Sequence, residues 1–305
     1  EITSKRDFVG ELEKASRDQG LKFGVYYSGG LDWSFNHSPV TNLWPDLFQS
    51  MPTSLAYTAY ADGHMHELIH KYKPDILWND VTYPANGDFL GIFSELFNLN
   101  PNAVINDRWQ KHEGLLDYTT PEYQVLDSIS SKKWETCRGL GYSFGFNRLE
   151  DERQTIASKD LVRLLVDIVS KNGNLLLNVG PKDDGTIPQI QLDRLADLGS
   201  WLKINGEGIY DTQTWKTFGH KNAEGLDLRF TRKGANLYVF IFNLPKNNTV
   251  HIPHLGSTKN AEAIVFGDES RKVKIVKSGD GIDIKLPENA KHSFCTMLKI
   301  TGITD

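Results

Sequence analysis

The sequence is poor in the features that mark several large classes of protein. Its 305 residues include only two cysteines, Cys137 and Cys295, which lie far apart, so no disulfide framework is indicated. No apolar run approaches the roughly 20 residues that a membrane-spanning helix needs. The formal charge of -5 leaves no excess of Lys and Arg to neutralise a phosphate backbone or an anionic membrane surface. The composition therefore argues against nucleic acid and membrane as partners.

The first residues also lack the marks of a secretory precursor. Residues 1–6 contain neither an initiating Met nor the apolar h-region of a signal peptide, so we expect processing or truncation upstream and leave the compartment open. The chain does contain 39% hydrophobic and 11% aromatic residues, which is enough for a soluble globular protein. Its length favours two domains.

The first two thirds of the chain alternate between helical and strand periods, which is the pattern of βα units around a parallel sheet. The parallel strands expected are 21–28, 75–80, 103–108, 134–138 and 174–180. A complete eight-stranded (β/α)8 barrel takes about 250 residues, so this region is about three strands short. We predict that residues 1–209 are a catalytic, N-terminally incomplete portion of a TIM barrel.

After Tyr210 the sequence changes to short strands separated by turn signals, with no helical period. The expected strands fall between residues 226 and 300. Regular short strands of this kind are typical of a β-sandwich. We therefore predict an antiparallel β-sandwich domain over residues 210–305.

One predicted strand ends in an acid. The run Asp-Ile-Leu-Trp-Asn-Asp at 75–80 is apolar until it reaches Asp80, and it then breaks at Val-Thr-Tyr-Pro. Parallel barrels present their reacting groups at the carboxyl ends of the strands. We interpret Asp80 as a catalytic nucleophile.

A second acid, Glu122, follows the next predicted strand within Thr-Thr-Pro-Glu-Tyr. Glycoside hydrolysis needs such a pair, one anionic carboxylate that attacks and one protonated acid that assists the leaving oxygen. Successive βα units would bring Asp80 and Glu122 to one rim of the barrel. Two rim acids are by themselves a weak signal, and ordinary surface carboxylates are the alternative.

Neighbouring side chains strengthen the interpretation. Trp78 precedes Asp80 by two residues, so strand alternation places both on one side, where the ring can form an apolar floor for a sugar. Arg108 can pair with Glu122 or a sugar hydroxyl, although a rim salt bridge explains it as well. Tyr26 can donate its hydroxyl into the same mouth, although a core tyrosine is equally consistent with the pattern.

A competing pattern is His66-Glu67-Leu-Ile-His70, which matches the H-E-x-x-H sequence of zinc hydrolases. On a helical projection both histidines lie opposite the apolar side, and no third ligand follows at a familiar spacing. A helix of a βα unit also lies outside the barrel. A solvated histidine face is therefore favoured, and a zinc hydrolase is kept as the minor alternative.

Taken together, these residues resemble the α-L-fucosidases of glycoside hydrolase family 29. The matching runs are Phe-Gly-Val-Tyr-Tyr-Ser-Gly-Gly-Leu-Asp-Trp at 23–33, Leu-Trp-Asn-Asp at 77–80, Asn-Asp-Arg-Trp at 106–109, Ser-Phe-Gly-Phe-Asn at 143–147, and 174–185. The resemblance implies a TIM barrel with a C-terminal β-domain. It also implies a retaining double displacement at the anomeric carbon of a terminal α-L-fucose in an oligosaccharide or glycoconjugate.

The resemblance also assigns roles. Asp80 matches the nucleophile, and Glu122 looks like the acid/base of the members that have an acid just before tyrosine in this loop; Glu113 and Glu135 are the fallbacks. Tyr26, Trp78 and Arg108 match positions that line the fucose pocket. No metal or organic cofactor is implied.

The resemblance has one departure. Family members begin with further strands that supply pocket histidines and an acidic residue beside a tryptophan, and no position here matches them. Three interpretations stay open: a piece of a longer or cleaved enzyme, a barrel completed by a second polypeptide, or an incomplete barrel with impaired binding. The partners left open are the missing N-terminal segment and a homo-oligomer, and the non-catalytic alternative is a partner-dependent glycan-binding fragment.

Overall fold

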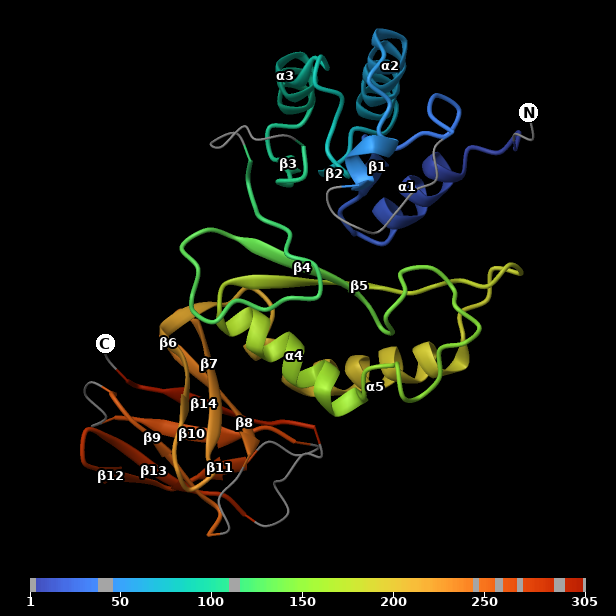
Figure 1. Ribbon diagram of the computed structural model, residues 1–305. Coiled ribbons are helices and arrows are strands. Elements are labelled where there is room, and N and C mark those ends of the chain that lie inside the picture. Colours follow the sequence, from blue (N-terminus) through green and yellow to red (C-terminus); the bar gives the residue numbers. More distant parts are fainter. Residues whose placement is uncertain are drawn as a thin grey trace. The chain divides into compact units, whose positions relative to one another are not determined.

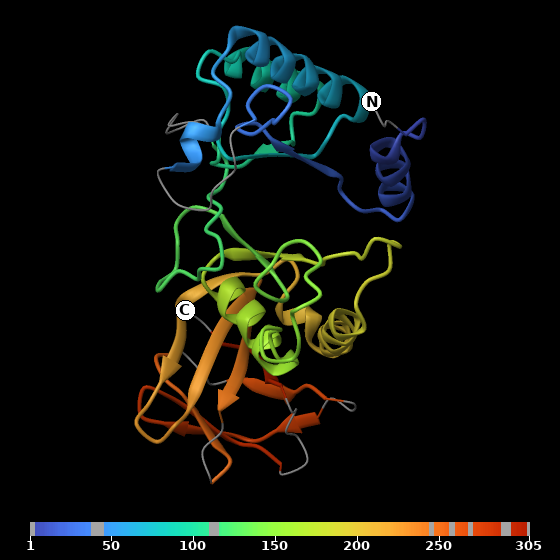
Figure 2. The same cartoon turned by 45° about the vertical axis from the view of Figure 1, so that its right-hand side comes forward.

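The computed structural model describes residues 4–37, 46–109, 116–243, 247–255, 260–267, 271–287 and 294–303 (Figures 1 and 2). The chain divides into two compact units, Glu1–Thr120 and Pro121–Asp305, and each is described by itself. Within the described ranges, no helix is both long enough and apolar enough to span a bilayer.

The first unit alternates strands with helices. Its elements are α1 (Phe8–Asp18), β1 (Gly24–Ser28), the 3-10 helix η1 (Asp46–Ser50), α2 (Leu55–Tyr72), β2 (Ile76–Asp80), α3 (Phe89–Leu99) and β3 (Val104–Ile105). The three strands form one sheet in the order β1-β2-β3, and both pairings are parallel. The predicted succession of βα units is therefore present here.

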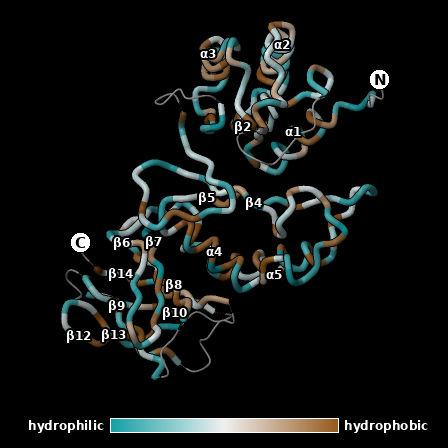
Figure 3. The backbone as a smooth tube through the Cα atoms, in the orientation of Figure 1, coloured by the Kyte–Doolittle hydropathy of each residue, from teal (hydrophilic) through white to brown (hydrophobic). Residues whose placement is uncertain are grey.

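Local signals in the sequence fix the ends of these helices. Ser54 and Asp88 cap α2 and α3, because their side chains accept hydrogen bonds from the backbone N–H groups of Tyr57 and Gly91. Lys73 ends α2 in a left-handed conformation, with a φ of 45°. The brown colour of α3 in Figure 3 reflects its apolar residues, which join those of α2 and the sheet in one core.

The third strand is shorter than predicted. We expected a strand over 103–108, but β3 covers only Val104–Ile105, and Asn106 forms an isolated bridge with Tyr118. The sequence remains apolar up to Ile105 and turns polar at Asn106. The backbone leaves the ladder at this point, so Arg108 is carried by a loop and not by the strand.

The second unit contains a parallel pair of strands, two long helices and two antiparallel sheets. Its elements are β4 (Trp134–Gly139), α4 (Ser158–Ser170), β5 (Gly173–Asn178), α5 (Gln189–Asn205), η2 (Gly206–Gly208), β6 (Gln213–Lys221), β7 (Asp227–Lys233), β8 (Asn236–Asn243), β9 (Thr249–Ile252), β10 (Glu262–Val265), β11 (Arg271–Val273), β12 (Ile275–Ser278), β13 (Gly281–Lys285) and β14 (Thr296–Thr301). The larger antiparallel sheet has the order β11-β10-β14-β8-β7-β6, and the smaller has the order β12-β13-β9. β6 was not among the predicted strands.

The central strands β8 and β14 of the six-stranded sheet are buried on both faces. Along β8, Leu237, Val239 and Ile241 join the core that the two antiparallel sheets share, as in a β-sandwich. The alternating residues Tyr238 and Phe240 join a second core, to which α4 and α5 contribute. Helices that the sequence assigns to the barrel portion therefore share a core with the C-terminal strands.

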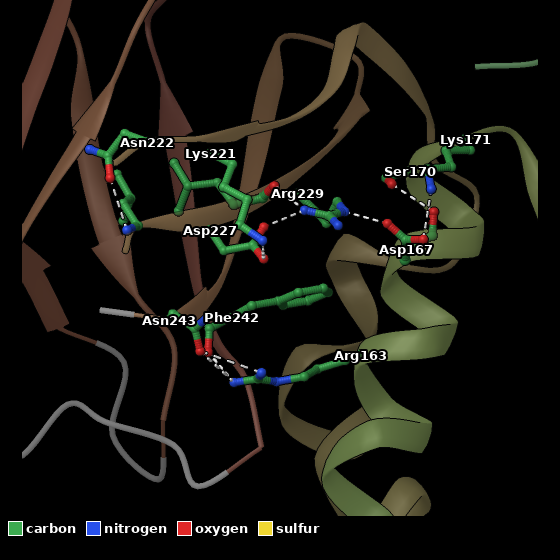
Figure 4. A network of polar contacts seen from close by, with 12 residues as sticks. Arg163, Asp167, Ser170, Lys171, Lys221, Asn222, Asp227, Arg229, Phe242 and Asn243 are labelled. Atoms are coloured by element: carbon green, nitrogen blue, oxygen red, sulfur yellow. Dashed lines mark hydrogen bonds and ion pairs between the residues drawn. The ribbon is translucent and has the colours of Figure 1, made fainter. Parts of the chain in front are cut away.

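A polar network fastens α4 to this sheet (Figure 4). Arg229 on β7 pairs with Asp167 on α4, and its Nη1 donates to Asp227 Oδ1 at 2.6 Å. Lys171 Nζ donates to the other oxygen of Asp167 at 2.7 Å. Less than a fifth of each of these side chains is exposed, so each charge depends on its partners for stabilisation.

This network yields a stability prediction. Replacing Arg229 by Met keeps the aliphatic stem but leaves two carboxylates without their shared cation, so we expect the free energy of unfolding to fall by about 3 kcal/mol. Urea denaturation followed by tryptophan fluorescence measures the change. The control is Arg153→Met, which removes an exposed arginine paired with Asp151 and should leave the midpoint nearly unchanged. Equal midpoints for the two variants would contradict the prediction.

Candidate active site

The carboxylate of Asp80 lies at the carboxyl end of β2 and accepts three hydrogen bonds. Tyr26 donates its hydroxyl to Oδ2 at 2.7 Å, while Arg108 Nη1 and the backbone N–H of Val81 donate to Oδ1 at 2.9 and 2.8 Å. Donors therefore fix both oxygens of this carboxyl group. The geometry holds the group in one orientation at the end of a parallel strand, where a nucleophilic carboxylate would have to be presented.

Tyr26 is positioned by the pairing of β1 with β2, in which it lies opposite Trp78. The residue keeps 60% of its accessible area, but its hydroxyl rests against Asp80. Burial of that end of the side chain, together with the hydrogen bond to Asp80, raises the pKa of the hydroxyl above its usual value. Tyr26 consequently stays protonated and remains a donor at neutral pH.

Trp78 supports both side-chain donors. Its ring stacks on that of Tyr26 with centroids 5.4 Å apart, and the Arg108 guanidinium carbon lies 4.7 Å from its centroid. Only 8% of Trp78 is exposed, so most of the ring contacts protein. Its expected role as a floor for a sugar stays a prediction, and the structure adds a supporting role that the sequence did not indicate.

Arg108 is held between two partners. Besides Asp80, it donates from Nε to Thr120 Oγ1 at 2.9 Å and from Nη2 to Thr120 O at 3.0 Å. Thr120 is in turn fixed by Asp107, whose Oδ1 accepts from the Thr120 hydroxyl at 2.6 Å and from its N–H at 2.9 Å. Sequence reasoning missed Asp107 and Thr120. It expected Glu122 or a sugar hydroxyl as the partner of Arg108, which stays a prediction, whereas the structure shows an ion pair with Asp80.

The turn that follows Asp80 is strained. Val81 and Thr82 have φ values of 54° and 65°, a left-handed conformation that β-branched residues rarely adopt. Gly30 lies so close to this turn that a Cβ there would be 1.8 Å from Val81 O. In the sequence, the Gly-Gly pair at 29–30 was the signal that could have indicated this contact, since glycine allows two backbones to approach closely.

Glu122 belongs to the second unit, so its pairing with Asp80 stays a prediction. It is exposed and forms an isolated parallel bridge with Cys137 of β4. The next residue, Tyr123, is held by its hydroxyl, which donates to Gly141 O at 3.1 Å and accepts from Gly139 N at 3.0 Å. Of the two fallback acids, Glu135 lies half-buried on β4, and Glu113 lies outside the described residues.

The H-E-x-x-H pattern lies on α2, where the two histidines contact one carboxylate. His66 Nδ1 and His70 Nε2 both pair with Glu95 of α3. Across the parts of the chain that the structure describes, no group of three or more His, Cys, Asp or Glu side chains is arranged to hold a metal ion. Nothing in the described structure supports the zinc alternative.

Comparison with known proteins identifies a family. A family model described as alpha-L-fucosidase matches residues 1–207. The tissue alpha-L-fucosidase of Homo sapiens is 29% identical over 321 residues, covering 99% of this chain and 66% of that protein. The plasma alpha-L-fucosidase of Rattus norvegicus is 32% identical over 309 residues, covering 95% of this chain and 64% of that protein.

Solved structures agree with this result. An alpha-L-fucosidase structure is 39% identical with a TM-score of 0.89, covering 97% of this chain and 67% of that one. The Thermotoga maritima alpha-fucosidase in complex with a mechanism-based inhibitor is 38% identical with a TM-score of 0.87, covering 97% and 68%. The chain thus spans about two thirds of the length of the relatives it matches.

Proposed function

Because the chain belongs to the alpha-L-fucosidase family, we propose that it serves the hydrolysis of terminal α-L-fucose from fucosylated oligosaccharides or glycoconjugates, with retention of anomeric configuration. The observation that carries the proposal is the Asp80 carboxylate, held by Tyr26 and Arg108 at the end of a parallel strand. A solved structure of the Thermotoga maritima alpha-fucosidase, which is 38% identical to this chain, contains fucose.

The proposed reaction has two displacements. Asp80 attacks the anomeric carbon while the bond to the leaving oxygen breaks and Glu122 gives that oxygen its proton. The resulting fucosyl ester is then hydrolysed by a water that Glu122 deprotonates, which restores both carboxyl groups. Retention requires the two carboxyl groups to be about 5 to 5.5 Å apart, so the proposal includes that separation.

The chain's other residues act by binding and orientation. Tyr26 and Arg108 hold the Asp80 carboxyl group in place by hydrogen bonds, and with Trp78 they form one side of the proposed fucose site. The proposal includes a TIM-barrel portion over 1–209 and a β-sandwich over 210–305. It calls for neither a metal nor an organic cofactor.

The stereochemistry of the first product tests the proposal. We expect the 305-residue chain to hydrolyse an aryl α-L-fucoside and to release α-L-fucose first, because two inversions restore the configuration. Proton NMR during the first turnovers distinguishes this anomer from β-L-fucose before mutarotation. The aryl β-L-fucoside is the control substrate and should not be cleaved. Release of β-L-fucose first, or no turnover of the α-anomer, would contradict the proposal for this chain.

A further inference from the structure

Two asparagines lie directly behind the Asp80 carboxylate. Asn79 and Asn106 are both fully buried, each with an exposed fraction of 0%. Side chains alternate along a strand, so Asn79 points to the opposite side of β2 from Trp78 and Asp80. Asn79 therefore does not face a sugar bound against the Asp80 carboxylate, and its buried amide needs another explanation.

The first part of that explanation lies in the way the sheet ends. The β2–β3 ladder stops where Leu77 lies opposite Ile105. Beyond it, the Asn106 side chain takes the place of a strand backbone: its Oδ1 accepts from Asn79 N at 3.0 Å, and its Nδ2 donates to Asn79 O at 2.8 Å. A primary amide offers the same donor and acceptor as a peptide group. The backbone after Ile105 is thereby free to turn, and it carries Arg108 towards Asp80.

The second part is the side chain of Asn79 itself. Its Nδ2 donates to Thr82 O at 2.8 Å and to Arg108 O at 2.9 Å. One amino group therefore ties together the turn after Asp80 and the backbone of the arginine that pairs with Asp80. Both tied segments donate to the same oxygen of Asp80, Oδ1, through Val81 N and Arg108 Nη1.

The left-handed turn makes this tie necessary. Residues in sparsely populated backbone regions cost on the order of 1 to 3 kcal/mol each and persist only where their surroundings hold them. Val81 and Thr82 are two such residues in succession. The Asn79 amide holds this turn from the buried side by a direct hydrogen bond from its Nδ2 to Thr82 O.

We infer that Asn79 is a positioning residue, which sets the orientation of the Asp80 carboxylate through the Val81–Thr82 turn and the Arg108 backbone without touching substrate. The inference rests on the proposed role of Asp80 as nucleophile. Displacing a reacting group by about 1 Å costs on the order of 10²-fold in rate. The loss falls on attack at the anomeric carbon and not on sugar binding.

The test is Asn79→Leu, which keeps the number and branching of the side-chain heavy atoms and removes both donated hydrogen bonds. The matched control is Asn100→Leu at the opposite end of β2, where Asn100 Nδ2 reaches Pro74 O and Asp75 Oδ1, both at 3.3 Å. The probe is a 2-deoxy-2-fluoro-fucosyl fluoride, which labels the nucleophile covalently. We expect the labelling rate of Asn79→Leu to fall about 10²-fold, with the affinity for L-fucose little changed. Asn100→Leu should label at the parent rate.

Three outcomes separate the possibilities. The inference would be overturned if Asn79→Leu labels at the parent rate and its crystal structure shows Tyr26 and Arg108 still in contact with Asp80. If the fluorosugar does not label Asp80 in the parent chain, the proposed function is defeated. The inference is then judged by the crystal structure of Asn79→Leu, in which Arg108 Nη1 should lie beyond hydrogen-bonding distance of Asp80 Oδ1. Should Asn79→Leu not fold, Asn79→Ala carries the same test, because an alanine side chain has no group that can donate to either carbonyl.

Discussion

Replacing Asp80 by Gly is expected to lower the turnover of an aryl α-L-fucoside by roughly 10⁴-fold or more, because the covalent step loses its nucleophile. The space left by the carboxylate admits a small anion. Added azide should therefore attack the anomeric carbon as the aryl oxide leaves, and it should restore part of the turnover. The product expected is β-L-fucosyl azide, since only one inversion takes place. Chromatography and NMR of the product measure this outcome.

The control for this experiment is Asp18→Gly, which removes an exposed carboxylate at the end of α1. It should keep the parent turnover and show no response to azide. Thermal unfolding of both variants checks that the fold is retained. Undiminished turnover in folded Asp80→Gly would remove Asp80 from the mechanism, and formation of α-L-fucosyl azide would rule out attack from the side of the lost carboxylate.

The second large effect is expected for Glu122→Gln, and it should depend on the leaving group. A sugar alkoxide needs a proton as it departs, so kcat/KM for a fucosyl disaccharide should fall by about 10² to 10⁴-fold. A dinitrophenyl fucoside needs no such assistance, and its kcat/KM should change little. Comparing the two substrates in one variant separates acid catalysis from a general loss of structure.

Two further variants decide between Glu122 and the other candidate acids. Glu135→Gln and Glu113→Gln remove the fallbacks and should reduce kcat/KM for both substrates alike or not at all. If Glu135→Gln shows the leaving-group dependence and Glu122→Gln does not, the acid/base is Glu135 on β4. An equal fall for both substrates in Glu122→Gln would assign that residue to binding.

Local patterns in the sequence predicted the elements whose ends coincide with a change from apolar to polar residues. The strand that ends at Asp80 was predicted because its apolar run stops abruptly, and β2 covers Ile76–Asp80. The resemblance to α-L-fucosidases was confirmed by the family match and by the solved relatives.

What the sequence could not predict depends on residues that are distant along the chain. The strand expected over 103–108 stops at Ile105 because the Asn106 side chain, and not its backbone, pairs with Asn79. The pairing of Arg108 with Asp80 likewise depends on the path of the backbone after β3. Hydropathy does not report which of several polar partners a loop residue meets, and Asp107 and Thr120 were missed for that reason.

The burial of β8 and β14 on both faces determines which parts of this chain can be removed or exchanged without exposing a core. One side of β8 and β14 packs against the smaller sheet, and the other side supplies Tyr238, Phe240 and Met297 to the core beneath α4 and α5. Deleting β8 and β14 would expose the apolar sides of α4 and α5. Replacing the C-terminal sheet by an unrelated domain would require an apolar surface that matches these helices. The C-terminal sheet and the helices above it therefore form one packing unit, in which neither part has a complete core without the other.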